Sequence, residues 1–227
     1  RTDQLIATAF LRMAPDGTGD APDDAKLAKN QVIAEQMKVT TSSLMGMTVA
    51  CAQCHDHPFE RWTQNQYYQM SAFFSAVGLR AGYEVGEEII FDQRADYEMK
   101  HPKDGRVVKP QFLLASAKPI AIPDDSRRRD ALADWLVSKD NPFFAKSVTN
   151  RVWSYFFGKG IIDPVDDIRG GNPPSNPVLL DALTAEFVKS GFDTRALMRT
   201  ICQSRTYQLS IIPNKWNEDD TINFSHA

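Results

Sequence analysis

Residues 177–191 read PVLLDALTAEFVKSG, and this stretch decides the fold class. Its large apolar residues recur three and four positions apart, which is the spacing of one face of an α-helix. They are Leu179, Leu180, Leu183, Phe187 and Val188. Glycine is favoured just after a last helical turn, so Gly191 marks the end of the helix. This is the cleanest amphipathic helix in the chain, and it points to a mostly α protein.

Helical patterns continue on both sides of this stretch. They predict helices over the first dozen residues, from about 24 to 49, from Thr63 to about Gly78, from Asp124 through Gly158 with a break at Asn141, and from about 194 to 207. Thr63 and Gln66 have capping-box spacing, in which each side chain bonds the other residue's backbone. Gly158 is expected to cap the helix that precedes it.

The pattern changes between Ala81 and Pro123. Residues 87–91 and 107–114 look like short strands, and Lys103–Arg106 is a turn signal between extended pieces. We therefore expect a mostly α fold, in which helical, bundle-like domains are separated by a small β insert. The predicted boundaries are 1–80 for the first domain, 81–123 for the insert or linker, and 124–227 for a second helical domain.

Composition excludes several classes of protein. The 227 residues are 42% hydrophobic and 24% charged, which is ordinary for a globular protein. The net charge of −3 lacks the basic excess that a nucleic-acid binder normally shows. The dense basic run Arg127–Arg129 lies beside acidic residues and is interpreted as a solvated helix start. No apolar stretch approaches the roughly 20 residues that a membrane span requires.

The residues that carry chemistry are Cys51-Ala-Gln-Cys54-His55. The C-x-x-C-H spacing supplies two thiols for the vinyl groups of one porphyrin, together with an imidazole that reaches the iron from the same turn of chain. We therefore expect a covalently attached haem c, with Cys51 and Cys54 as thioether tethers and His55 as the proximal iron ligand. Zinc bound by both cysteines with His57 and His101, a redox dithiol, a disulfide and a chance match remain alternatives.

The sixth iron position stays open at this level. His101 lies away from the motif, and Pro102 favours extended backbone for it, which suits a side chain that reaches out of a loop. A water-filled site or a thioether is the alternative, and the methionines considered are Met45, Met47, Met70 and Met99. His57 follows the proximal ligand too closely to reach the opposite haem face, so a hydrogen bond to a propionate or ligation of another centre is expected.

Polar side chains inside apolar helical patterns give a weaker candidate site. Asn150, Arg151 and Arg205 would line a substrate cleft for sugar hydroxyls or carboxylates, whereas a buried Arg–Asp network that locks the helices together is the structural alternative. Asp56 would either orient an imidazole or cap a loop. The third cysteine, Cys202, lies on an apolar helical face and is expected to be a buried thiol.

Two long groups of residues resemble known families. The runs Leu44–Phe59, Trp62–Tyr68 and Ser71–Phe74 resemble the planctomycete-type cytochrome-c-like domain, of which residues 1–80 would be the C-terminal part. The region from Arg129 onward is similar to that domain's usual C-terminal companion. The matching runs are Arg129–Leu136, Asn141–Phe144, Thr149–Trp153, Phe156–Gly160, Pro174–Pro177 and Ser204–Gln208. Both are families of unknown function.

The resemblance implies an exported bacterial protein, commonly with another cytochrome-c-like module upstream. Because the chain begins with Arg1, we expect a fragment or processed product whose signal lay further upstream. The resulting expectation is a periplasmic or otherwise exported haem protein that transfers electrons or forms part of an oxidoreductase. Its partner would be a redox protein or the upstream module. The alternatives are a zinc-stabilised scaffold of a cell-surface assembly and a carbohydrate-active enzyme with haem as its redox partner.

Overall fold

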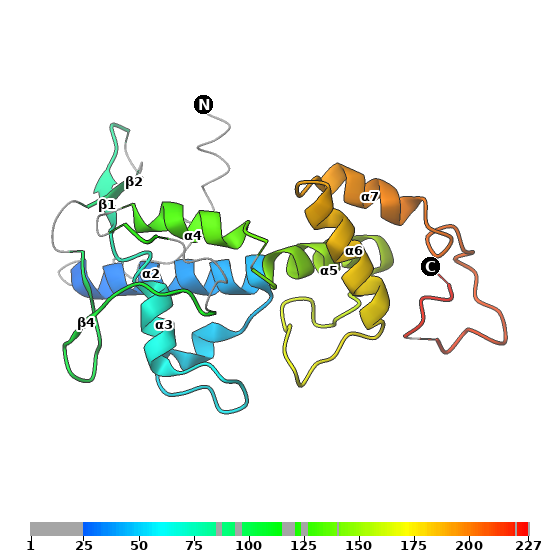
Figure 1. Ribbon diagram of the computed structural model, residues 1–227, viewed down its shortest axis with the longest axis horizontal. Helices are drawn as coiled ribbons and strands as arrows, with labels where there is room; N and C mark the ends of the chain where they lie inside the picture. The colour runs from blue at the N-terminus through cyan, green and yellow to red at the C-terminus, as the bar shows by residue number, and fades with distance from the viewer. Residues whose placement is uncertain are drawn as a thin grey trace. The chain divides into compact units, whose positions relative to one another are not determined.

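The computed structural model describes residues 25–84, 88–93, 97–114, 121–123, 127–139, 141–220 and 222–226. These residues form a mostly α structure with two small antiparallel sheets, which confirms the predicted fold class (Figure 1). The helix expected over the first dozen residues lies outside the described part. The chain divides into two compact units. The described residues of Arg1–Thr40 and Val49–Asp140 form the first unit. Those of Thr41–Thr48 and Asn141–Ala227 form the second.

Among its described residues, the first unit contains three α-helices and a short 3-10 helix. They are α2 (Ala25–Val39), the 3-10 helix Val49–Gln53, α3 (Gln64–Ser71) and α4 (Arg128–Leu136). The predicted capping box is confirmed at the start of α3, where the Thr63 side chain accepts from the Gln66 N–H and the Gln66 side chain accepts from the Thr63 N–H. The predicted end of this helix near Gly78 is wrong. The helix ends at Ser71, because Val77 already pairs with Asp92 in a sheet.

Two antiparallel hairpins form the β part of this unit. Strand β1 (Val77–Ala81) pairs with β2 (Glu88–Asp92), and β3 (Met99–Lys100) pairs with β4 (Val107–Val108). The predicted strands thus exist, but the second one covers only two of its eight predicted residues. The expected turn between them is present, and Gly105 occupies the left-handed region there with a φ of 70°.

Helix α4 packs in the first unit, whose residues run to Asp140. Trp135 is fully buried, and its ring stacks on Phe112, which stacks in turn on Phe73. Arg128 is also fully buried, and its guanidinium donates to the Glu98 carboxylate at 2.8 Å. The interpretation of the arginine run as a solvated helix start is therefore wrong for Arg128, because the partly buried Glu98 carboxylate compensates this guanidinium for the loss of water.

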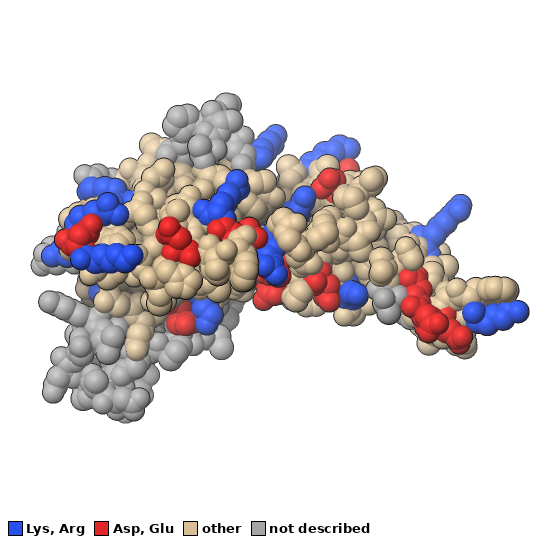
Figure 2. Space-filling model, turned by 90° about the horizontal axis from the view of Figure 1, so that it is seen from below, with Lys and Arg blue, Asp and Glu red and all other residues tan. Residues whose placement is uncertain are grey.

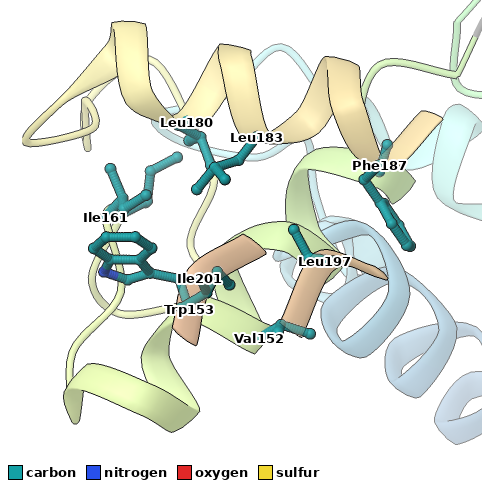
Figure 3. Close-up of a cluster of buried hydrophobic side chains, with 10 residues drawn as sticks. Val152, Trp153, Ile161, Leu180, Leu183, Phe187, Leu197 and Ile201 are labelled. Carbon is teal, nitrogen blue, oxygen red and sulfur yellow. The ribbon is translucent and has the colours of Figure 1, made fainter. Parts of the chain in front are cut away.

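The second unit is a helical bundle of α5 (Phe144–Phe157), α6 (Pro177–Lys189) and α7 (Thr194–Cys202). Figure 3 shows the apolar faces of these helices converging on one core around Trp153 and Leu180. The helix predicted over 177–191 is confirmed, and the Asn176 side chain caps its start. Gly158 ends α5 in the left-handed conformation, as predicted. Cys202 is half-buried rather than buried.

Surface charge follows the composition. Figure 2 shows basic and acidic side chains interspersed over one face of the molecule, which matches a net charge of −3. Within the described part of the chain, no helix combines the length and the apolar character needed to cross a membrane.

Candidate functional site

The cysteine motif lies on the 3-10 helix Val49–Gln53 and the turn that follows it. Val49 and Ala52 are fully buried and hold the inner face of this helix against the first unit. Cys51 and Cys54 lie on the outer side, where both free thiols are exposed. The exposed side of this short helix and the turn after it therefore present the two cysteines to the solvent.

His55 is exposed directly after the second cysteine. Its Nδ1 lies 2.6 Å from the backbone carbonyl oxygen of Asp56. Because a carbonyl oxygen accepts only, Nδ1 is the donor in this contact, and in the neutral form of the ring Nε2 carries the lone pair. Metal-binding histidines generally use one ring nitrogen in this way while the other binds the metal. The ring of His55 thus presents Nε2 as an available ligand atom.

The loop after the motif is ordered by His57. Its ring Nδ1 accepts from the backbone N–H groups of Phe59 at 3.2 Å and Glu60 at 3.0 Å, and the backbone N–H of His57 donates to the Trp62 carbonyl at 2.8 Å. A nitrogen that accepts two hydrogen bonds is unprotonated, so the proton of this ring is on Nε2. In the structure, His57 closes the loop through its backbone and ring.

Residues of helix α3 hold the motif in place through hydrogen bonds. The Asp56 carboxylate accepts from the Gln64 N–H at 2.7 Å, which caps the helix and favours the loop-cap alternative for Asp56. The Gln53 carbonyl, between the two cysteines, accepts from Gln64 Nε2 at 2.9 Å and from the Tyr68 hydroxyl at 3.2 Å. Sequence reasoning missed Gln64 and Tyr68, because their spacing from the motif carries no recognisable signal.

A small cavity of about 150 Å³ opens beside the motif, between α2, α3 and β3. Its lining includes Gln53, Tyr67, Tyr68, Met99 and Lys100. Burial raises the pKa of Tyr67 to about 12, and it also raises the pKa of Tyr68, with a smaller contribution from the nearby Cys54. Both phenols therefore stay protonated at neutral pH and can donate hydrogen bonds.

His101 lies at the end of β3 and is buried. Its ring packs edge-on against Tyr68 with the centroids 5.0 Å apart, and its Nδ1 accepts from the Lys103 N–H at 3.3 Å. Among the methionines, Met99 lines the cavity and Met70 is fully buried in α3, whereas Met45 and Met47 belong to the second unit.

The zinc alternative requires ligand side chains that converge. Cys51, Cys54, His57 and His101 are all described, yet within the described ranges no group of three or more His, Cys, Asp or Glu side chains is placed to hold a metal ion. The four residues of the expected zinc set are thus not preassembled.

The cleft expected in the second unit has a different arrangement. Asn150 is fully buried, and its amide donates to the Ile162 carbonyl and accepts from the Ile162 N–H, each at 2.8 Å. Arg151 is partly buried and lies 3.5 Å from the Ser42 carbonyl, whereas Arg205 is exposed. Asn150 therefore fixes the backbone at Ile162 and offers no amide atom to a ligand.

Two protein-family models match the chain. Residues 1–78 match PSCyt2, described as a protein of unknown function (DUF1549). Residues 128–225 match PSD1, described as a protein of unknown function (DUF1553). The whole cysteine motif lies in the PSCyt2 match, and α5, α6 and α7 lie in the PSD1 match. No significant match was found among curated proteins or solved structures.

Proposed function

We propose that the first unit carries one covalently attached haem c, and that the protein is an exported electron-transfer protein or a component of a haem-dependent oxidoreductase. The single observation that supports this most is the state of the motif. Two exposed thiols and an exposed imidazole share one anchored turn, and the Nδ1 of that imidazole is already bonded to a carbonyl. A haem c attachment site uses this donor set.

Each residue of the motif would have its own role in holding the haem. Cys51 and Cys54 would each add their S–H across a vinyl group, so that two C–S bonds form and no group leaves. His55 would bind the iron through Nε2, with the Asp56 carbonyl fixing the orientation of its ring. Haem at this position supplies a one-electron carrier. The hydrogen bonds from Gln64 and Tyr68 to Gln53 hold the backbone between the two sulfur atoms.

The proposed haem attachment implies a cellular compartment. Both must stay reduced until haem is attached and must be handled outside the cytoplasm, so we place the protein in the periplasm or an equivalent exported compartment. Its partner would be a redox protein or an upstream cytochrome module of the same polypeptide.

The test is production in a bacterial host that is competent in cytochrome c maturation. We expect a Soret band, about one iron per chain, and haem that stays with the protein after acid–acetone extraction. The variant with both Cys51→Ser and Cys54→Ser should lose all covalent haem. Cys202→Ser is the matched control, because it removes a thiol from the second unit, and it should retain the haem.

A second pair of variants separates the two histidines. His55→Gly should lose the axial imidazole, and added free imidazole should restore the wild-type spectrum. His57→Gly should keep that spectrum, because His57 acts on the loop backbone. Colourless wild-type protein from the competent host would contradict the proposal, and one zinc per chain in place of iron would favour the scaffold alternative.

A further inference from the structure

The residues just before the cysteine motif belong to the second unit. Residues 41–48, which we call the strap, pack with Asn141–Ala227, although Thr40 and Val49 on either side belong to the first unit. The strap begins within a π-helix, Thr40–Leu44, and ends three residues before Cys51. Such π-helical turns are rare and often mark functional positions.

Gly46 contacts the rest of the second unit through its backbone. Its carbonyl accepts from the Ile168 N–H at 2.7 Å. Its φ is 65°, a conformation that favours glycine, and a Cβ at this position would lie 2.6 Å from Ile168 Cδ1 and 3.3 Å from Ser147 Oγ. Glycine is therefore required here for both backbone and space.

Burial shows that the strap is part of a core rather than a surface loop. Thr41 and Met45 are fully buried, and Met47 is 2% exposed. The Arg151 guanidinium lies 3.5 Å from the Ser42 carbonyl. Removing the strap would take the apolar side chains of these two methionines out of a buried environment, which is unfavourable in water.

A segment of the second family match also packs in the first unit. Helix α4 lies inside the PSD1 match, yet it packs in the first unit. There its Trp135 stacks on Phe112, and its Arg128 bonds Glu98. The strap lies inside the PSCyt2 match, yet it packs in the second unit. Each compact unit is thus built from residues of both matched segments.

We propose that the PSCyt2-type and PSD1-type segments are obligate structural partners that interlock through the strap and α4. The surface of α5 and the Ile168 loop is an interaction site, and its partner is a buried, glycine-containing strap from a PSCyt2-type segment. The second unit then also fixes the chain at the entry to the motif, because the strap leads directly into the helix that carries Cys51.

The test uses the full-length apo-protein with a site-specific protease sequence inserted after Lys139, an exposed residue in the turn that follows α4. After cleavage, the fragment with the strap and the fragment with α5, α6 and α7 should elute together under native conditions. Gly46→Ala should raise their dissociation constant roughly tenfold beyond Gly158→Ala. Gly158 is the matched control, since it has a φ of 71° but open space around its Cβ position.

A double-variant cycle in the uncut chain keeps the proposal testable if cleaved Gly46→Ala protein fails to fold. Hydrogen exchange at the Ile162 N–H, which bonds Asn150 inside the second unit, reports the opening of that unit. Gly46→Ala should increase opening roughly tenfold more in the wild-type background than in Ile168→Ala, which lacks the colliding atoms.

Two results would contradict the proposal that the two segments are obligate structural partners. One is separation of the wild-type fragments in native buffer. The other is equal effects of Gly46→Ala and Gly158→Ala, combined with no coupling between positions 46 and 168. Neither measurement depends on haem, so the outcome is independent of the function proposed above.

Discussion

Arg128 and Arg129 are neighbours in sequence, but the structure predicts very different consequences of their loss. The Arg128 side chain is 0% exposed and donates to Glu98 at 2.8 Å and to Ser75 Oγ at 3.4 Å, with its guanidinium over the Tyr97 ring. Arg129 is 26% exposed and pairs with Asp92 at 2.6 Å. Replacing each with methionine keeps an unbranched apolar stem, and it removes the guanidinium group with its charge, its donors and, at Arg128, its ring contact.

We expect Arg128→Met to destabilise the first unit by about 3 kcal/mol, at the lower end of the cost of breaking a buried pair. The lower end applies because Glu98 retains Lys109 at 3.1 Å. Arg129→Met should cost about 1 kcal/mol or less, since its pair is partly solvated. Urea unfolding should show the difference, with the Arg128→Met midpoint about 1.5 M lower if the slope is near 2 kcal/mol per M.

The pH dependence gives a second readout of the same pair. Burial alone would raise the pKa of Glu98, but hydrogen bonds from Arg128 and Lys109 hold it below its usual range. A lowered folded-state pKa stabilises the fold above the unfolded pKa of the carboxyl, and this stabilisation is lost as the pH falls through the folded value. Arg128→Met should weaken that acid sensitivity. Equal losses of stability for the two variants would refute the reasoning.

Three further predictions concern other buried groups. Asn150→Ala should destabilise the second unit by about 2–5 kcal/mol, because it leaves the Ile162 N–H and carbonyl unpaired, whereas Asn172→Ala at a partly exposed site should cost less; urea unfolding compares them. Ultraviolet titration should show Tyr67 ionising near pH 12, and Tyr67→Phe should remove this step. Stability from the raised pKa of Tyr67 is complete below about pH 10 and is lost as the pH rises through about 12, which alkaline unfolding measures. His57→Ala should speed exchange of the Glu60 amide with little effect on α6, because only the loop loses its acceptor.

Local signals in the sequence predicted the parts of the fold that depend on neighbouring residues. Thr63 and Gln66 bond each other across one helical turn, and Gly158 needs only its own backbone conformation to cap α5. The apolar face of α6 follows from its own periodicity. In each case the deciding interaction spans a few residues, so the sequence pattern contains it.

The features that sequence reasoning missed depend on distant residues. Helix α3 stops at Ser71 because Val77 pairs with a strand that begins beyond residue 87. Arg128 is buried because Glu98, 30 residues away, accepts its hydrogen bond. Gly46 must be glycine because Ile168, more than 120 positions away in sequence, leaves no room for a Cβ. Periodicity over a window of 10 to 20 residues cannot include such partners.

The cysteine motif differs from the third cysteine in its exposure, and this difference supports the chemical role that we propose for the motif. Free cysteine is among the most buried residue types in proteins, and Cys202 follows that tendency by lying half-buried in α7. Cys51 and Cys54 are exposed, although the turn that carries them is fixed by the buried residues Val49 and Ala52. Disorder of the turn therefore does not explain their exposure. A turn that is held in place while it exposes two thiols and an imidazole is the arrangement that the proposed haem attachment would need.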